Sequence, residues 1–275
     1  MAVFLGVLAA PRLTGLAAVP PPTMSPPATL QPDSTYTPSP TSPSAQPTQK
    51  ATLRPAPTPT APSASQLIVS MQASDLAAAT ARLRFSSDFD EHGLTRVSTS
   101  AQGEVDFRRH ALRISSRLQY RPSSGSVRRP MEDFVQLGRR EATRIRPHSW
   151  RCAARSGFAL PVGPGMLAAV VGGQMKSTYA RPVETTLHGT PVWHVHQTIA
   201  ATKAGTGSGA GSVDYFISRA HHTLLRTQVG VAASVRHLGT GKRQSQLTTV
   251  TDAAQQDLSS YGQAITITLP KACRG

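Results

Sequence analysis

From residue 83 onward, apolar and polar side chains alternate along the chain with a period of two. Residues 83–90 set leucine and phenylalanine against arginine and aspartate, and residues 96–107 and 112–121 repeat the alternation. This period places successive side chains on opposite faces of a strand, so that one face packs and the other stays wet. The three runs predict an antiparallel meander of half-buried strands.

One hairpin of this meander can be aligned residue by residue. A two-residue turn at positions 108–109 pairs Val105 with Leu112 on the buried face and Glu104 with Arg113 on the exposed face. Apolar residues then face each other and opposite charges face each other, which stabilises cross-strand pairs. The alternation therefore predicts a register as well as a strand pair.

The rest of the chain adds further strands and one or two helices. Residues 66–81 are alanine-rich with apolar positions near helical spacing, and residues 165–171 precede a Gly-Gly stop, so each predicts a helix. Residues 203–212 are glycine-rich and predict a flexible connection. The expected fold is mainly antiparallel β (α+β), with about ten or eleven strands. Its remaining strands are expected at 134–137, 142–146, 183–187, 191–201, 213–219, 223–235, 244–251 and 264–269.

The first 65 residues differ in composition from the rest. Residues 1–19 are apolar and indicate an export signal or a weak membrane anchor. Residues 20–65 contain fourteen of the 23 prolines and few charges, which is typical of an extended linker. We expect residues 66–275 to form one β-rich domain held outside the cytoplasm, in the cell envelope. No cysteine lies near the N-terminal segment, so anchoring through a lipidated N-terminal cysteine is not expected.

Charge and cysteine content refine this picture. The net charge of +15 comes from 29 basic and 14 acidic residues. The basic residues are spread along the predicted strands, so the pattern favours attraction to an anionic membrane or cell-wall surface over nucleic-acid binding. Cys152 and Cys273 are the two cysteines, and an even count in an exported chain favours a disulfide, with two unpaired buried thiols as the alternative.

The apolar stripe of the sheet is the candidate ligand-binding surface. It either forms a filled core under the helices or leaves a cavity for apolar molecules, and periodicity does not separate the two. The candidate lining residues are Phe85, Phe89, Val105, Phe107, Leu112, Ile114, Leu118, Tyr120, Trp193, Val195, Tyr215 and Ile217.

Histidines are the candidate metal ligands, and no catalytic motif is present in the sequence. His194 and His196 lie two apart on one predicted strand and share a face, and a symmetric hairpin would place His221 opposite His194. No carboxylate adjoins this set in sequence, and the shared face is expected to be solvated. We therefore expect neither an enzyme nor a cofactor, and keep the metal site as a less favoured hypothesis.

Three passages resemble the LolA/LolB-like superfamily, which includes LppX/LprG-type envelope lipoproteins. They are the strand pairs VETTLHGTPVWHVHQTI and VDYFISRAHHTLLRTQV and the closing segment YGQAITITLP, within a likeness over about residues 66–273. The resemblance implies a curved, unclosed half-barrel sheet over helices. It also implies noncatalytic binding of acylated lipids or lipoproteins in an apolar cavity.

Taken together, the sequence predicts an exported, monomeric carrier or sensor of a lipid or another apolar ligand. The alternative is a structural or interaction module of the envelope with a filled core and no ligand.

Overall fold

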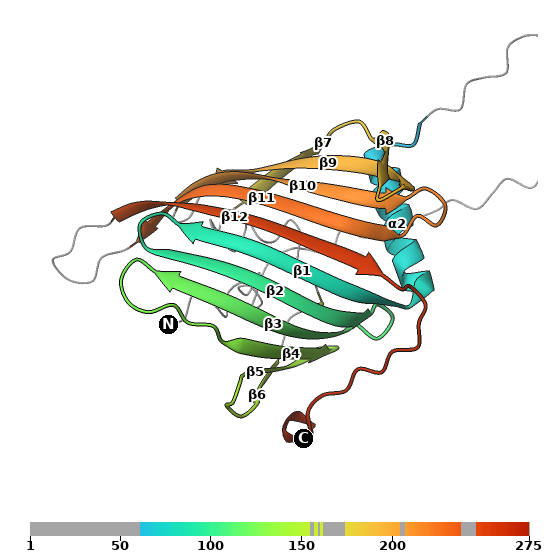
Figure 1. Cartoon of the computed structure of the whole chain (residues 1–275). Helices are drawn as coiled ribbons and strands as arrows, with labels where there is room; N and C mark the ends of the chain where they lie inside the picture. Colours follow the sequence, from blue (N-terminus) through green and yellow to red (C-terminus); the bar gives the residue numbers. More distant parts are fainter. Residues whose placement is uncertain are drawn as a thin grey trace, which may run out of the picture. The chain divides into compact units, whose positions relative to one another are not determined.

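The computed structural model describes residues 61–154, 157–158, 160–161, 174–203, 207–237 and 246–274. In these residues the chain forms one α-helix, a 12-stranded antiparallel sheet and a short 3-10 helix (Figure 1). The predicted helix at 165–171 and the N-terminal segment to residue 60 lie outside the described residues. The bounds are α2 Ala64–Ala78, β1 Thr80–Glu91, β2 Thr95–Asp106, β3 Ala111–Pro122, β4 Met131–Leu137, β5 Arg140–Ile145, β6 Arg151–Ala154, β7 Gln174–Tyr179, β8 Val183–Leu187, β9 Thr190–Lys203, β10 Gly207–Ser218, β11 Leu224–His237, β12 Gln246–Ser259 and η1 Lys271–Cys273.

The sheet is open and consists of two meanders joined at one strand pair. Its order is β6-β5-β4-β3-β2-β1-β12-β11-β10-β9-β7, with β8 also paired to β9. The two halves meet where β1 pairs with β12, for example at Leu83 opposite Leu258 and Phe89 opposite Asp252. The expected fold class, an unclosed and mainly antiparallel sheet with a helix, is confirmed.

The helix α2 begins with a capping box. The Ser63 hydroxyl accepts a hydrogen bond from the Gln66 backbone, and the Gln66 side chain accepts one from the Ser63 backbone. Leu67 and Met71 pack into the main core. The helix ends three residues earlier than predicted, because Ala79 adopts a positive φ of 67° and Ala81 is needed in β1.

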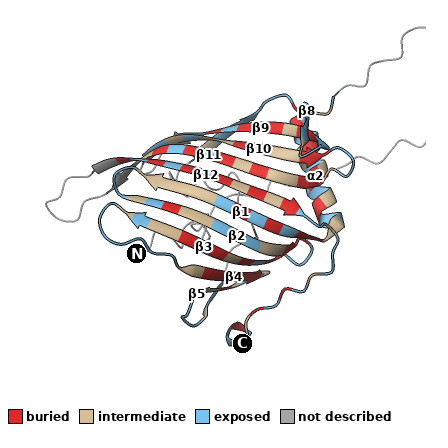
Figure 2. Cartoon of the chain, in the orientation of Figure 1, coloured by how far each residue is buried: buried red, intermediate tan, exposed pale blue. Residues whose placement is uncertain are grey.

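Alternation sorts the side chains of the sheet onto two faces. The inner face, which bears Leu83, Val105 and Leu112, holds the main core with α2, and the outer face bears most of the charged residues. Figure 2 shows buried and exposed positions succeeding each other along the strands. The packed face of the predicted meander is therefore the inner face.

The predicted hairpin register is confirmed. Val105 pairs with Leu112, and Glu104 pairs with Arg113, with which it forms an outer-face ion pair. The turn spans residues 107–110, and His110 supplies the positive φ (49°) that a tight turn needs.

The C-terminal segment differs from the expectation. Residues 264–269 were expected to form a strand, but the chain here runs without strand pairing across the outer face. Ile267 and Leu269 pack against Ala111, Val135 and Ala142 in a second core cluster. Apolar and polar residues do alternate here, but they do so because one side of an extended segment packs on the outer face of the sheet and the other side faces solvent.

The Cys152–Cys273 disulfide fastens this segment to β6 and confirms the predicted pairing. Its sulfur atoms join residues 121 apart in the sequence. Because the bond closes so long a loop, it restricts the unfolded chain strongly.

Two further strands were not predicted. They are β6 and β7, which are short and weakly patterned. The glycine-rich stretch at 203–212 is also largely strand, since β9 runs to Lys203 and β10 begins at Gly207. At Gly211 a Cβ atom would lie 2.7 Å from the Gly230 carbonyl oxygen, so glycine permits this close pairing.

Among the described residues, no helix is both long and apolar enough to span a membrane.

We expect the Cys152→Ser/Cys273→Ser double variant to lose about 4 kcal/mol of unfolding free energy, because the unfolded chain regains the freedom of a long loop. Chemical denaturation of the oxidised protein and the variant measures this loss. Adding a reductant should lower the stability of the wild type toward that of the variant and leave the variant unchanged. Equal stabilities of the variant and the oxidised wild type would contradict the prediction.

Candidate ligand pocket and candidate metal centre

Eleven of the twelve predicted lining residues lie on the inner face of the sheet, and Phe107 lies in the turn after β2. The twelve do not all line one cavity. Phe85, Phe89, Ile114 and Leu118 line a common pocket. Two of these, Phe85 and Ile114, also belong to the main core. The other members of the predicted set in that core are Val105, Phe107, Leu112, Trp193, Val195 and Ile217, and Tyr215 packs against it. Tyr120 is half-buried, and its hydroxyl lies 3.3 Å from the Thr95 hydroxyl. The predicted stripe is thus partly core and partly pocket.

The pocket lies on the inner side of β1–β4 and β12. Its apolar wall also includes Val97 and Ala101, and its polar wall consists of Ser87, Thr99, Ser116, Glu132 and Asp252. The cavity volume is about 30 Å³, which is room for roughly two water molecules. A larger molecule enters only if side chains at the wall rotate, and half-buried Phe89 is the least confined of the large ones.

Two acidic side chains in the pocket wall were missed by sequence analysis. Asp252 is 5 % exposed, and among the described residues its Oδ1 atom has no hydrogen-bond partner. Burial, reinforced by the charge of Asp88, raises the pKa of Asp252 to about 6. Glu132 is 8 % exposed, and its pKa is raised by burial and by the neighbouring Asp133. The sequence signal that could have found them is an acidic residue at an inward-facing position of a strand in which apolar and polar side chains alternate.

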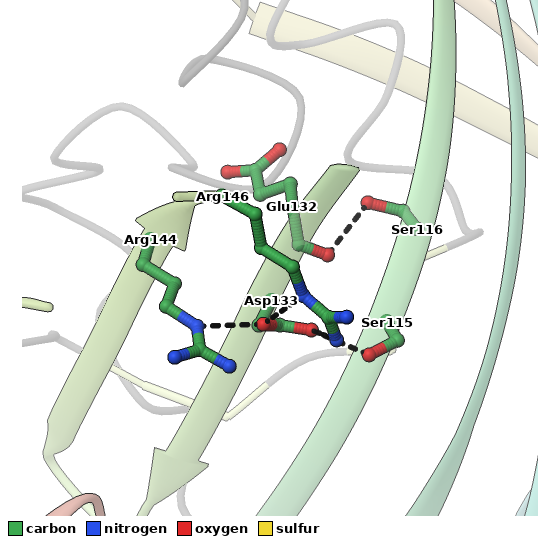
Figure 3. Close-up of polar contacts among 6 residues, drawn as sticks. All are labelled: Ser115, Ser116, Glu132, Asp133, Arg144 and Arg146. Carbon is green, nitrogen blue, oxygen red and sulfur yellow. Dashed lines mark hydrogen bonds and ion pairs between the residues drawn. The ribbon is translucent and has the colours of Figure 1, made fainter. Parts of the chain in front are cut away.

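Asp133, the neighbour of Glu132 on β4, shows the contrast between the two faces (Figure 3). Its carboxylate accepts hydrogen bonds from Arg144 at 2.7 Å, from two nitrogens of Arg146 at 2.7 and 2.8 Å, and from Ser115 at 2.6 Å. These contacts, above all the Arg146 hydrogen bond, hold the pKa of Asp133 well below its usual range. In the part of the chain that the structure describes, no donor reaches the Glu132 carboxylate.

Other unpartnered polar atoms follow the inner face of β12. Thr248, Asp252 and Gln256 stand four residues apart on this face, and each has a buried polar atom to which no described residue forms a hydrogen bond. Leaving such an atom unpaired costs about 1–3 kcal/mol. The inner face of β12 therefore carries a row of polar atoms that receive no hydrogen bond from the described residues.

The predicted histidine pair forms a separate cluster on the outer face. Asp214 Oδ1 lies 2.7 Å from His194 Nε2 and 2.8 Å from His196 Nδ1, and the three ligand atoms lie within 4.8 Å of one another. All three side chains are partly exposed. Two imidazole nitrogens and one carboxylate oxygen form a set that suits Zn²⁺ or Cu²⁺.

His221 does not belong to this cluster. The residue opposite His194 is Phe216, whose ring stacks on the imidazole at 4.8 Å, and His221 lies in the turn after β10. The prediction failed because β10 extends through the glycine-rich stretch and sets a different register. Asp214, on that strand, provides the carboxylate that sequence neighbours of the histidines do not.

Comparison with known proteins gives a diffuse resemblance. No family model matches the chain, and no curated protein matches it. A solved LolA superfamily protein from Nitrosomonas europaea matches with a TM-score of 0.27 and 8 % identity, over 75 % of this chain and 96 % of that one. The S-type phycobiliprotein lyase CPES from Guillardia theta matches with a TM-score of 0.20 and 7 % identity, over 67 % and 90 %. The expected likeness to the LolA superfamily is thus found in weak form, and the fold assignment rests on the strand pairings.

The raised pKa of Asp252 predicts how stability depends on pH. A carboxyl group with a pKa near 6 when folded and about 3.9 when unfolded binds more protons in the folded state. Stability is therefore full below pH 4 for this group and falls as the pH rises to about 6, by up to about 3 kcal/mol. We expect Asp252→Asn to remove this part of the decline. It leaves the parts that come from Asp75, whose pKa burial raises to about 6, and from Glu132, whose pKa burial also raises. Urea unfolding from pH 4 to pH 7.5 tests this, and parallel profiles for the two proteins would exclude it.

Proposed function

We propose that the protein is a noncatalytic, exported carrier or sensor that holds an apolar ligand, such as a lipid or lipoprotein acyl chain, against the inner face of its sheet. The pocket between β1–β4 and β12 is the observation on which the proposal rests. Its wall is mostly apolar, with Phe85, Phe89, Val97, Ile114 and Leu118 on neighbouring strands. Ligand pockets of proteins combine such apolar walls with a few polar groups.

The unpartnered polar atoms in this region favour a ligand over a filled core. Interiors that only support a fold nearly always pair their buried polar groups. Here Asp252 Oδ1 lies in the pocket wall without a hydrogen-bond partner from the described residues, and Thr248 and Gln256 on the same strand also have such atoms. The alternative, an envelope module with a filled core, offers no reason for this row.

Two features support a site of action outside the cytoplasm. The Cys152–Cys273 disulfide fits an oxidising compartment. The outer face carries exposed arginines, among them Arg84, Arg117 and Arg121, on β1 and β3. Such a face is attracted to anionic membrane or cell-wall surfaces and would orient the carrier there.

Filling the pocket should weaken ligand binding. We expect Ala101→Trp, which places an indole in the pocket wall, to weaken binding of the uncharged fluorescent probe N-phenyl-1-naphthylamine at least about tenfold by steric exclusion. The matched control is Ser100→Trp, because Ser100 is exposed on the opposite face of β2. Thermal unfolding of both variants checks that they fold.

Native mass spectrometry of the mildly purified protein gives the complementary result. A bound lipid that is lost in Ala101→Trp and kept in Ser100→Trp supports the carrier. A wild-type protein that is purified empty and takes up no probe contradicts it and supports the filled module.

The geometry of His194, His196 and Asp214 favours a second candidate function, binding of a divalent transition metal on the outer face. The nitrogen–oxygen distances of 2.7 and 2.8 Å are those of hydrogen bonds. Two ligands of one tetrahedral Zn²⁺, each about 2.0–2.1 Å from the metal, stand about 3.3 Å apart. Small rotations of these partly exposed side chains would therefore admit the ion, and water would complete its coordination.

We expect the protein to bind one Zn²⁺ in calorimetric titration, and His194→Ala to weaken this binding at least about tenfold by removing one of three ligands. His221→Ala is the matched control, because His221 is an exposed histidine outside the cluster. Equal weakening by the two variants, or no binding by the wild type, would rule out this centre.

A further inference from the structure

We propose that the pocket selects apolar molecules that carry an amine or ammonium group, and that Asp252 and Glu132 bind this group. The inference rests on the proposed function, since it names the chemical class of the ligand in the same pocket. It specifies the polar group of the ligand, about which the apolar wall of the pocket gives no information.

The first support is the distribution of charge between the two faces. On the outer face, several acidic side chains of the sheet have arginine partners, and Asp214 has His194 and His196. The arginine pairs are Asp88–Arg96, Glu104–Arg113, Asp133–Arg144, Asp133–Arg146 and Asp257–Arg226. In the part of the chain that the structure describes, no base pairs with Glu132 or Asp252 on the inner face. A chain with a net charge of +15 has enough arginine for both, but strand alternation directs it outward.

The second support is that both acids face one pocket. Asp252 comes from β12 and Glu132 from β4, with three strands between them in the sheet, and both line the same cavity. Each is more than nine-tenths buried. A buried carboxylate is costly without a compensating charge or donor, so each of these two acids in the pocket wall is a group that a cation would complete.

The third support is the composition of the remaining wall. Phe85, Ile114 and Leu118 offer apolar contact for a hydrocarbon body. A hydrated inorganic cation such as Ca²⁺ prefers six to eight oxygen ligands and gains nothing from this wall. An amphiphile with a carboxylate end would bring a third negative charge to the two acids. An ammonium group donates up to three hydrogen bonds and fits both parts of the pocket.

The experiment compares three ligands of equal chain length that differ only in their polar end. Decylammonium, decanol and decanoate, each below its micelle concentration at pH 7.5, displace N-phenyl-1-naphthylamine from the oxidised, full-length protein. We expect decylammonium to bind at least about tenfold more tightly than decanol, as for one charge-assisted hydrogen bond, and decanoate to bind most weakly.

The double variant Glu132→Gln/Asp252→Asn assigns the preference to the two acids. It should lose the advantage of decylammonium over decanol while still binding decanol, which also shows that it folds. Glu104→Gln is the matched control, because Glu104 is an outer-face acid paired with Arg113, and it should keep the preference.

The outcomes separate this inference from the proposed function. Failure of all three ligands and of the probe to bind overturns the carrier and the inference with it. Equal binding of the three ligands, or a preference for decanoate, overturns the inference and leaves the carrier. A preference that survives in the double variant, or that CaCl₂ abolishes by competition, also overturns it.

Discussion

The pairing of β1 with β12 is the interaction on which the rest of the structure depends. It joins two six-strand halves that share no other pairing among the described strands, and it sets Leu83 against Leu258 and Phe89 against Asp252. Because β12 follows β1 by more than 150 residues, this contact closes a long loop and exists only in the folded chain. Through it the inner face becomes one continuous surface, and a carboxylate of β12 enters a pocket whose other walls come from β1–β4.

The two faces of the sheet carry different kinds of interaction. The outer face holds the ion pairs, the histidine–aspartate cluster and the C-terminal segment that the disulfide fastens. The inner face holds the core and, beside it, the row of unpartnered polar atoms on β12. Such atoms reduce stability, and the raised pKa of Asp252 expresses the same cost. The proposed ligand provides a reason for keeping them, since a site that binds a polar end must present groups that the protein itself leaves unsatisfied.

The sequence predicted the structure correctly where a local pattern has only one structural solution. The meander from Leu83, its register at Val105 and Leu112, and the disulfide all follow from short-range alternation or from the cysteine count. The prediction failed where the same pattern has two solutions. Residues 264–269 alternate like a strand but lie on the outer face of the sheet, and the glycine-rich stretch was read as a loop although β9 and β10 extend into it. The acids of the pocket were missed because Asp252 and Glu132 lie just outside the expected strands at 244–251 and 134–137, whereas β12 and β4 include them.

The sequence by itself determined which side chains share a face, because a strand's period of two is a property of the backbone. It therefore indicated an antiparallel sheet with an apolar inner stripe, and it placed His194 and His196 together on the other side. Only the tertiary structure decided which strands are neighbours. The pairing of β9 with β10 brought Asp214 to the histidines in place of His221. The order of the strands placed Glu132 and Asp252 in one pocket. The reason is that pairing between distant strands depends on the whole set of contacts that close the sheet, which no local period encodes.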